Sequence, residues 1–528
     1  NNMNQILSIL RTDFYKQGLA DQYDPSIEKL VSYYTPRISH LKDINEVPVI
    51  GLQAFIKDVL IEDFNKNFFQ RPLSEVIKEY EFIIESTMGK NRISSKKVMN
   101  LHKLGYLPIE INALEEGTLC PIKCPMIEIT NTHPDFAWCV NLIESIMSSE
   151  LWYMGCTATV GRLYRNIVNK YYKLTSDNEQ NAKHAISEFG FRGLPGQETA
   201  VKASMGFLAS FDKTATIPSI LEINRWYGDD LSSIGSGMAS TEHSVMCSSY
   251  ELDGKNEQKT LHRLLKEIYP DGNVSIVCDS YDYWNVIENI IPKLYGVIMG
   301  RKGTLFVRGD SGDPVDITVK TVLKLSKIFA GETTVNNKGY MVLPKQIRVI
   351  YEDSITPIRA RKIYEQLQIA GFSAENVALG TGSFSMLCLE EEETDWEIGS
   401  ESTTSKKEKT ILQPFTRDTF GVAIKTTYGE QAIYHHCDHA ENGFEKQIKP
   451  FNIFKDPKTD TGNFKKSQKG CCIVFLDQNG KITYEDGKIY SEAHNDNRNL
   501  LLPLFANGNL LRETSFMAIR NKLWNNNF

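Results

Sequence analysis

Four short apolar runs in the middle of the chain each end in side chains suited to phosphate, ribose or metal chemistry. The run 274–278 is followed by Asp279, and the run 304–307 by Arg308 and Asp310. The run 347–351 is followed by Asp353, and the run 376–379 by the turn Gly380, Thr381, Gly382 and Ser383. Carboxylates hold Mg²⁺ or ribose hydroxyls, a guanidinium pairs with phosphate or stacks on a ring, and a glycine turn presents N–H groups to phosphate. A single strand-end acid often only caps a loop, but several at successive strand ends predict a phosphate-and-metal site.

Two motifs outside these runs carry further candidate groups. His243 lies between Glu242 and Ser244 after a glycine-rich stretch. An imidazole there can act as a general base, accept a phosphoryl group or serve a purely structural role. Phe189 and Arg192 place an aromatic ring and a cation within four positions. A flat heteroaromatic base can stack on such a ring, although the same residues suit a packed strand equally well.

The elements around these residues predict how they are positioned. Strand, polar or glycine turn, helix and strand alternate from about residue 274, which is typical of a parallel α/β array. A helix is expected to begin at Thr356 and Pro357, with the threonine as its cap. In closed barrels of this kind the chemistry gathers at the carboxyl ends of the strands. Elsewhere the periodicity predicts helices over 51–69, 135–152, 195–211 and 283–294, and a strand over 107–112.

The length of the chain, 528 residues and 60.0 kDa, requires more than one hydrophobic core. We expect an N-terminal α+β domain over 1–150, an α/β barrel domain with the catalytic strand ends over 151–390, a polar insertion over 391–410, and a segment over 411–528 that completes the barrel edge and the α+β domain. The insertion is acidic first and basic last, which predicts an exposed, mobile segment. Its place beside the glycine turn also allows a lid.

The composition argues against several classes of protein. A net charge of −7 and a pI near 5.9 disfavour nucleic-acid binding. The sequence contains no run of ~18 apolar residues, so no membrane span is expected. The first nine residues do not resemble a secretory signal. Ten scattered cysteines suit the reducing cytoplasm. His435, His436, Cys437 and His439 are potential metal ligands, but adjacent strand residues point to opposite faces, which favours a hairpin tip.

Taken in order, the motifs resemble those of the nicotinamide phosphoribosyltransferases over nearly the whole chain. The matching stretches include Thr-Asp-Phe-Tyr-Lys at 12–16, Phe-Gly-Phe-Arg-Gly at 189–193, Glu-His-Ser at 242–244, Asp-Ser-Tyr-Asp at 279–282, Asp-Ser-Gly at 310–312, Thr-Arg-Asp at 416–418 and Phe-Lys-Asp-Pro at 454–457. The resemblance implies an α/β fold of the type II phosphoribosyltransferase kind. Such a fold has an irregular parallel (β/α) barrel, an additional α+β domain formed by the N- and C-terminal segments, and a head-to-tail homodimer with both active sites at the interface.

The resemblance also implies a reaction and its site. Enzymes of this family, which are pentosyltransferases, join nicotinamide to 5-phosphoribosyl 1-pyrophosphate with Mg²⁺ in NAD salvage, and ATP phosphorylates a histidine that here would be His243. Phe189 and Arg308 would sandwich the nicotinamide ring, with Asp13 and Tyr15 contributed by the partner subunit. The donor would be held by Asp279 and Asp310 together with the metal, and its ribose hydroxyls by Asp353. The implied phosphate-binding residues are Arg37, Arg192, Gly380, Thr381, Gly382, Ser383, Arg417 and Lys425.

One departure from the family pattern concerns the base. Ala215 stands where the family has an aspartate that accepts a hydrogen bond from the carboxamide. Without that acceptor the preference for amide over acid is open, and Asp212 or Ser275 is the candidate replacement. An enzyme that takes nicotinic acid is therefore one alternative.

Three further departures cluster at the phosphate end of the donor. Glu352 replaces a glycine, Ser383 and Phe384 replace part of the glycine turn, and the polar segment 390–409 is inserted. These changes motivate a second alternative, a larger pyrophosphorylated donor such as an ADP-ribose derivative, which would give a dinucleotide directly. The third alternative is a non-catalytic nucleotide-binding protein. The retention of four candidate catalytic residues argues against it: His243, Asp279, Arg308 and Asp310.

Overall fold

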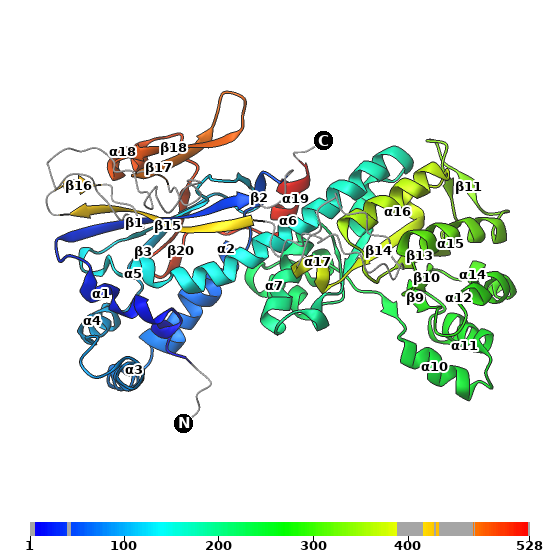
Figure 1. The fold of residues 1–528 in the computed structure, drawn as a ribbon, viewed down its shortest axis with the longest axis horizontal. Helices are drawn as coiled ribbons and strands as arrows, with labels where there is room; N and C mark the ends of the chain where they lie inside the picture. Colours follow the sequence, from blue (N-terminus) through cyan, green and yellow to red (C-terminus); the bar gives the residue numbers. More distant parts are fainter. Residues whose placement is uncertain are drawn as a thin grey trace, which may run out of the picture. The chain divides into compact units, whose positions relative to one another are not determined.

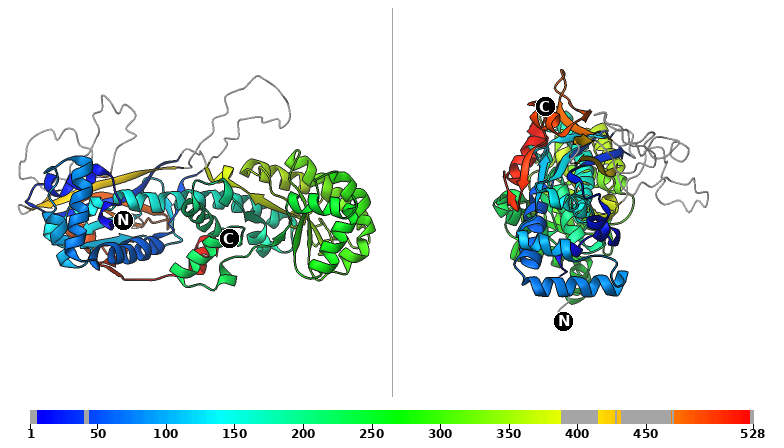
Figure 2. Two further views of the ribbon diagram at one scale, coloured as in Figure 1. Left: turned by 90° about the horizontal axis from the view of Figure 1, so that it is seen from below. Right: turned by 90° about the vertical axis from the view of Figure 1, so that its left-hand side faces the viewer.

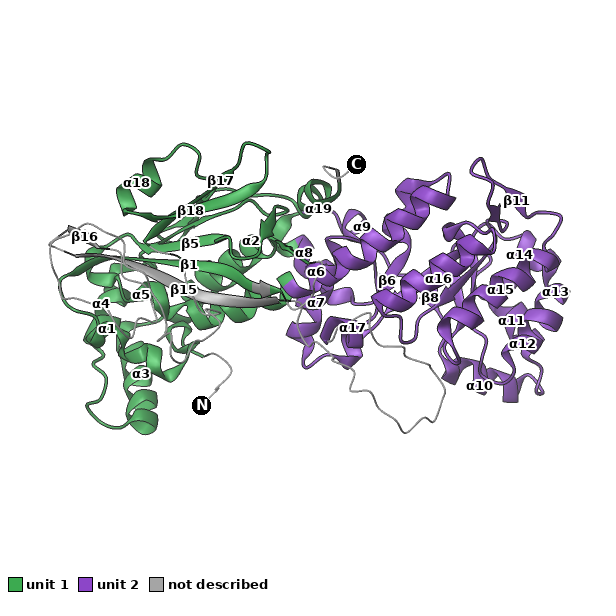
Figure 3. Ribbon diagram, turned by 45° about the horizontal axis from the view of Figure 1, so that its top comes forward, with its two compact units in different colours: residues 1–155, 225–228, 415–528 green, residues 156–224, 229–414 purple. Residues whose placement is uncertain are grey.

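A computed structural model gives the structure of the chain. It describes residues 6–39, 44–387, 415–426, 429–431, 468 and 470–525, without the side chains of 38, 415–426, 429–431 and 525. The polypeptide forms two compact units (Figure 3): unit 1 comprises 1–155, 225–228 and 415–528, and unit 2 comprises 156–224 and 229–414. Among the described residues no helix is long and apolar enough to cross a membrane.

Unit 1 is built on a seven-stranded antiparallel sheet with the strand order β16-β15-β1-β5-β3-β19-β20. The strands are β1 (Ile27–Ser39), β3 (Ile109–Ala113), β5 (Ile127–Asn131), β15 (Phe415–Thr426), β16 (Gly429–Gln431), β19 (Leu502–Ala506) and β20 (Asn509–Leu510). The long strands β1 and β15 run side by side (Figure 1, Figure 2). The sheet therefore joins segments from the two ends of the chain, and the strand expected over 107–112 is β3.

Helices and two smaller strand pairs complete unit 1. The pairs are β2 (Glu46–Pro48) with β4 (Leu119–Pro121), and β17 (Cys471–Leu476) with β18 (Ile482–Lys488). The helical segments are η1 (Ser8–Leu10), η2 (Phe14–Gly18), α1 (Leu19–Gln22), α2 (Leu52–Phe55), η3 (Ile56–Asp63), η4 (Asn65–Phe69), α3 (Leu73–Met88), α4 (Lys96–Leu104), η5 (Pro134–Phe136), α5 (Cys139–Leu142), α18 (Tyr490–Asn495) and α19 (Phe516–Asn525). The helix expected over 51–69 is confirmed as the succession α2, η3 and η4.

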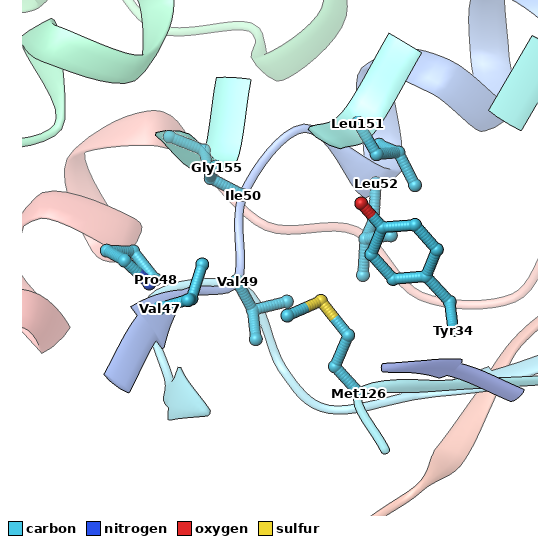
Figure 4. Close-up of a pocket in the computed structure, with 9 residues that line it drawn as sticks. All are labelled: Tyr34, Val47, Pro48, Val49, Ile50, Leu52, Met126, Leu151 and Gly155. Carbon is cyan, nitrogen blue, oxygen red and sulfur yellow. The ribbon is translucent and has the colours of Figure 1, made fainter. Parts of the chain in front are cut away.

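A small apolar cavity lies in unit 1 beside β2 and α2 (Figure 4). Its walls are formed by Tyr34, Val47, Pro48, Val49, Ile50, Leu52, Met126, Leu151 and Gly155. A volume of about 10 Å³ holds one water molecule at most. The cavity is therefore a packing defect of the core and cannot admit a substrate.

A buried hydrogen-bond network joins the sheet of unit 1 to α18. The Glu128 carboxylate, 1% exposed, accepts hydrogen bonds from the Tyr33 hydroxyl (2.6 Å) and the Asn112 amide (3.1 Å), and it lies 2.8 Å from His494 Nε2. Burial acts to raise the pKa of Glu128, but its bonds to His494, Tyr33 and Asn112 lower it overall. Burial acts to lower the pKa of His494, but the bond to Glu128 raises it overall. Both shifts favour a charged pair in the core.

Unit 2 contains a second seven-stranded sheet, with the order β7-β6-β14-β13-β10-β9-β8, in which every pairing is parallel. Its strands are β6 (Ile186–Glu188), β7 (Lys213–Thr214), β8 (Ala239–Ser240), β9 (Val274–Val277), β10 (Leu305–Gly309), β13 (Ile347–Tyr351) and β14 (Val377–Thr381). A parallel bridge between Lys213 and Ser236 joins β7 to the segment that leads into β8. The two edges of the sheet are thereby connected, which confirms the expected irregular parallel barrel.

Helices connect the strands of unit 2, and α15 and α16 pack on each other beside β13 (Figure 1). Besides the small pair β11 (Thr334–Val335) and β12 (Met341–Val342), the connecting segments are η6 (Glu179–His184), η7 (Phe191–Gly193), α7 (Gln197–Leu208), α8 (Ile217–Tyr227), α9 (Leu231–Ile234), α10 (His243–Leu252), α11 (Glu257–Arg263), η8 (Leu264–Ile268), α12 (Tyr283–Asn285), η9 (Val286–Ile290), α13 (Ile291–Lys293), α14 (Tyr295–Met299), α15 (Pro314–Ile328), α16 (Pro357–Ile369), η10 (Ala374–Asn376) and α17 (Ser383–Leu387). As predicted, Thr356 caps α16, because its side chain accepts a hydrogen bond from the Arg359 N–H.

The helix expected over 135–152 has the wrong bounds. Two short segments, η5 and α5, cover most of its first turns, and α6 begins at Glu144 and continues to Thr175. Gly161 does not end α6 but permits close packing on α7, because a Cβ at this position would lie 3.3 Å from the Phe207 backbone. A glycine inside a helix can thus mark a helix contact instead of a helix end.

The substitution His494→Gln should remove a pH-dependent part of the stability of unit 1. A raised histidine pKa stabilises the fold below the ordinary value of 6.5, and the contribution is lost as the pH rises through the raised value. A lowered glutamate pKa stabilises the fold above the ordinary value of 4.5, and that contribution is lost as the pH falls through the lowered value. The pair is therefore most stabilising between these two ordinary values.

Thermal unfolding of the two proteins at pH 5.5 and pH 9 measures the effect. We expect the variant to lose on the order of 2 kcal/mol at pH 5.5, as for a hydrogen bond to a charged group, and much less at pH 9. An equal loss at both pH values would contradict the prediction.

Candidate active site

The carboxyl ends of the unit 2 strands bring the candidate groups together. Because every strand of this sheet is parallel, the residues that follow the strands lie together at the carboxyl ends of the strands. This end of the sheet is called the site edge below, and the end at which the strands begin is called the opposite edge. The site edge carries His243 after β8, Asp279 after β9, Arg308 and Asp310 at the end of β10, Glu352 and Asp353 after β13, and the turn 380–383 at the end of β14. The four apolar runs of the sequence are β9, β10, β13 and β14, so the predicted strand-end arrangement is confirmed.

His243 and Asp279 form a hydrogen-bonded pair. His243 is the first residue of α10, and its Nε2 lies 2.9 Å from Asp279 Oδ1. The second Asp279 oxygen accepts hydrogen bonds from the Asp310 N–H (3.2 Å) and from the Ser311 hydroxyl. Burial opposes the ionisation of Asp279, but the bonds from Ser311, His243 and Asp310 outweigh it and lower the pKa. A charged carboxylate therefore orients the His243 ring, whose side chain is 49% exposed.

Asp310 lies in surroundings that disfavour its charge. Its Oδ1 is buried and has no hydrogen-bond partner, and its Oδ2 lies 3.4 Å from Arg308 Nε. The pKa of Asp310 is raised overall, because burial and the neighbouring Asp279 outweigh the lowering effect of Arg308. A carboxylate with an orphaned buried oxygen is stabilised when a cation binds beside it.

The Asp279 and Asp310 carboxylates are of the kind that would hold a Mg²⁺ ion whose other ligands are not protein side chains. Mg²⁺ binds oxygen and is usually held by one or two carboxylates, water and substrate phosphates. Asp279 and Asp310 lie close together, since the backbone of one donates to the side chain of the other. Within the described residues no cluster of three or more His, Cys, Asp or Glu side chains could form an all-protein metal site. The remaining ligands would therefore come from water and from an anionic donor.

The Arg308 guanidinium is buried and fixed along its edges. It is 6% exposed, its Nη2 donates to the Thr241 carbonyl (2.6 Å), and its Nη1 lies 3.3 Å from Glu352 Oε2. With the Asp310 contact, these interactions involve residues from three strand ends and set the plane of the group. A planar cation held in this way is suited to stacking on a ring. The pairing with Glu352 is a feature that the separate motifs did not indicate.

Phe189 lies against the turn at the end of β14. Its N–H donates to the Thr381 carbonyl (3.0 Å), which ties the end of β6 to β14. A Cβ on Gly380 would lie 2.6 Å from Phe189 Cε1 and 2.8 Å from Glu352 Cγ. Real Cβ atoms do not approach so closely, so Gly380 is required by the packing of these two side chains. The glycine turn thus positions the aromatic ring, in addition to the phosphate role that the resemblance implies.

A buried carboxylate that the sequence did not single out braces the neighbouring loops. Glu188 is fully buried and accepts hydrogen bonds from the hydroxyls of Thr214 (2.6 Å) and Thr216 (2.9 Å) and from the Gly190 N–H (2.8 Å). These bonds connect the turn after β6 with the turn after β7. The acid at the end of β6 was visible in the sequence, but its partners lie too far along the chain for a local motif to reveal them.

The structure separates the two candidates for the missing carboxamide acceptor. Ala215 follows β7 at the site edge, is exposed, and donates its N–H to the Glu188 carbonyl (2.7 Å). The Asp212 prediction is wrong, because Asp212 precedes β7 at the opposite edge and accepts a hydrogen bond from His184 Nδ1 (2.7 Å). Ser275 lies within β9, and its fully buried hydroxyl has no hydrogen-bond partner. Of the two, only Ser275 has an uncommitted polar group.

The implied phosphate-binding residues of unit 2 lie at or near the turn after β14. Arg192, in η7, is exposed. Ser383 packs against Gly193, where a Cβ would lie 2.7 Å from the Ser383 Cβ.

Asp353, the residue implied to hold the ribose hydroxyls, is exposed and accepts a hydrogen bond from the Ser354 hydroxyl (3.0 Å). Ser354 has a φ of 54°, a conformation that non-glycine residues adopt at a cost and that is concentrated at functional sites.

The other site residues inferred from the sequence belong to unit 1 or fall outside the description. Asp13, which accepts a hydrogen bond from Ser145, and Tyr15 and Arg37 are residues of unit 1. Arg417 and Lys425 lie in β15, where the backbone alone is described. The predicted insertion 391–410, the His435 to His439 cluster and the motif at 454–457 lie outside the described residues.

Comparisons with known proteins agree with this arrangement. A model of the nicotinate phosphoribosyltransferase (NAPRTase) family matches residues 184–410. The chain is 32% identical to the nicotinamide phosphoribosyltransferase of Acinetobacter baylyi, over 97% of this chain and 96% of the relative. It is 26% identical to the nicotinamide phosphoribosyltransferase of Xanthomonas campestris pv. campestris, over 97% of both chains.

Solved structures share the fold. The nicotinate-nucleotide pyrophosphorylase from Pyrococcus furiosus matches with a TM-score of 0.55 at 13% identity, over 99% of this chain and 96% of that one. Human nicotinic acid phosphoribosyltransferase matches with a TM-score of 0.54 at 12% identity, over 97% and 92%. At these identities the structures support the fold alone. Because the Acinetobacter baylyi relative matches over nearly the whole of both chains, the chain belongs to the nicotinamide phosphoribosyltransferase family, within the wider NAPRTase family.

Proposed function

We propose that this protein condenses nicotinamide with 5-phosphoribosyl 1-pyrophosphate to nicotinamide mononucleotide and pyrophosphate, as a cytoplasmic enzyme of NAD salvage. The observation that carries the proposal is the single edge on which a fixed guanidinium, an aromatic ring, two adjoining aspartates and a glycine turn meet. The names of the full-length relatives support the same activity. The described cysteines in the core, such as Cys120 and Cys278, are free thiols, which suits a reducing compartment.

The reaction matches the chemistry of these side chains. Departure of pyrophosphate from C1 leaves a sugar with oxocarbenium character, which the ring nitrogen of nicotinamide attacks. Little proton transfer is needed, so the protein contributes positioning and charge stabilisation. Arg308 and Phe189 would orient the ring, and the carboxylates of Asp279 and Asp310 would favour the cationic sugar. Mg²⁺ bound at these aspartates would neutralise the charge that develops on the leaving pyrophosphate.

Product analysis tests this reaction. Purified protein with Mg²⁺, nicotinamide and phosphoribosyl pyrophosphate should give a product with the mass of nicotinamide mononucleotide. Asp310→Asn should lower kcat/KM by about 100-fold or more, because it removes charge from the centre of the site. A parallel reaction receives a pyrophosphorylated ADP-ribose donor. Turnover of the larger donor alone would overturn the phosphoribosyl proposal, and turnover of neither would leave the nicotinic acid and non-catalytic alternatives.

We also propose that ATP phosphorylates His243, with transfer of the γ-phosphoryl group to a ring nitrogen and release of ADP. The geometry that supports this step is the exposed imidazole ring held by a charged, hydrogen-bonded Asp279. The chain offers a matched control in His184, whose Nδ1 lies 2.7 Å from Asp212 at the opposite edge of the sheet.

Incubation with γ-labelled ATP should therefore label the wild-type protein and His184→Asn, but not His243→Asn. The label should be stable to alkali and labile to acid, as expected for a phosphoramidate. Equal labelling of both variants, or loss of label from both, would contradict a specific role for His243.

We propose that two copies of the chain complete each other's sites, with Asp13 and Tyr15 donated across the interface. The support is the exposure of the neighbouring aromatic side chains Phe14 and Tyr15, which are 60% and 61% exposed on unit 1. Large exposed aromatic side chains are typical of interfaces.

Mixing two impaired variants tests this shared site. Tyr15→Ala and Arg308→Ala should each be weakly active alone, but subunit exchange would produce heterodimers with one intact site. Recovery to about a quarter of wild-type activity is expected for random pairing in a twofold dimer. Absence of recovery, although sedimentation shows that dimers have exchanged, would contradict shared sites.

A further inference from the structure

Glu352 is the carboxylate at the site edge to which the reaction above gives no task. Arg308 pairs in register with Ile350, so Glu352, two positions further along the chain, is expected on the same face as Arg308. Its Oε2 lies 3.3 Å from Arg308 Nη1. Its Cγ and the Phe189 ring both lie close to Gly380, within the space that a Cβ at that position would need. One side chain therefore lies beside both residues that would hold the nicotinamide ring.

Most of the other carboxylates at this edge are committed, and Asp353, which is exposed beyond β13, is the residue implied to hold the ribose hydroxyls. Both oxygens of Asp279 accept hydrogen bonds, from His243, Ser311 and the Asp310 backbone. Both oxygens of Glu188 are likewise engaged. Asp310 has its unpaired oxygen where a cation would bind. Glu352 Oε1, in contrast, has no hydrogen bond to any described residue and is free to accept one from a ligand.

The side chain at the position where an acceptor would be expected is a methyl group, and the remaining candidate, Ser275, has an unpartnered hydroxyl but no charge that would repel an acid. Ala215 follows β7 with a methyl side chain, and Asp212 lies at the opposite edge of the sheet. Nicotinamide and nicotinic acid differ only in the group that such an acceptor would contact. A carboxylate accepts a hydrogen bond from an amide N–H₂ but repels another carboxylate, so its presence discriminates in both directions.

We propose that Glu352 makes this protein select nicotinamide over nicotinic acid, with Oε1 accepting a hydrogen bond from the carboxamide while Oε2 stays paired with Arg308. The inference rests on the proposed function, because it assigns the base specificity of that same site. It gives Arg308 two tasks, since the guanidinium that faces the base also holds the carboxylate that recognises it.

The test compares kcat/KM for nicotinamide and for nicotinic acid in wild-type protein, Glu352→Gln and Glu267→Gln. Glu267 is exposed in η8, which precedes β9 at the opposite edge of the sheet, so it is a matched control. The ratio of the two kcat/KM values should fall by about 10- to 100-fold in Glu352→Gln, as for the loss of a charged hydrogen-bond acceptor, and should stay unchanged in Glu267→Gln. Because both substrates are assayed with one preparation, a change in the folded fraction cancels from the ratio.

A second variant tests the same idea by restoration. Adding Ala215→Asp to Glu352→Gln supplies a new carboxylate at the edge and should recover at least part of the preference for the amide. A wild-type protein that does not turn over nicotinamide would overturn the proposed function itself. A wild-type protein that prefers the amide, with Glu352→Gln keeping the same ratio or lowering both values equally, would leave that function standing and overturn the role of Glu352.

Discussion

The buried positive charge of Arg308 is the constraint around which the site edge is organised. A guanidinium removed from water costs several kcal/mol unless it is paired and hydrogen-bonded. Its partners come from three strand ends: the Thr241 carbonyl beyond β8, Asp310 beyond β10, and Glu352 beyond β13. The ends of these strands must therefore keep their relative positions for the charge to remain paired. Since the Asp310 N–H also holds Asp279, the same constraint extends to the His243 pair.

The carboxyl groups at this edge bear on which ligands the proposed site would attract. Three carboxyl groups, those of Asp279, Asp310 and Glu352, surround the one buried guanidinium, and burial raises the pKa of Asp310 and of Glu352. A pyrophosphate group would be repelled by such a surface, whereas a divalent cation or a sugar that becomes cationic would be attracted. In the proposed reaction an anionic donor would enter together with its cation, and the same carboxylates would favour the transition state over the ground state. The orphaned oxygen of Asp310 is the part of this arrangement that the bound cation would satisfy.

The sequence predicted best those parts of the site that follow from strand periodicity. Asp279, Arg308, Asp310 and the turn at Gly380 lie together because parallel strands align their carboxyl ends. The short strands β6, β7 and β8 have too few residues for a periodic pattern, so nothing showed that Asp212 precedes a strand instead of following one. The Arg308–Glu352 pair joins neighbouring strands far apart in the chain, and no local motif encodes it. The close contact between Gly161 and the Phe207 backbone joins two helices far apart in the chain, and sequence spacing does not contain it.

The pairing of β1 with β15 has a consequence for how the protein is made. Ribosomes extend chains at about 5 to 20 residues per second, so the roughly 380 residues between these strands take about 20 to 75 s to synthesise. During that interval β1 can pair with β5, but its other edge has no strand to receive it. Unpaired edges recruit strands from other chains, and natural sheet proteins are built to avoid exposing them. The nascent N-terminal segment therefore depends on shielding from neighbouring chains until translation reaches the strand that covers it.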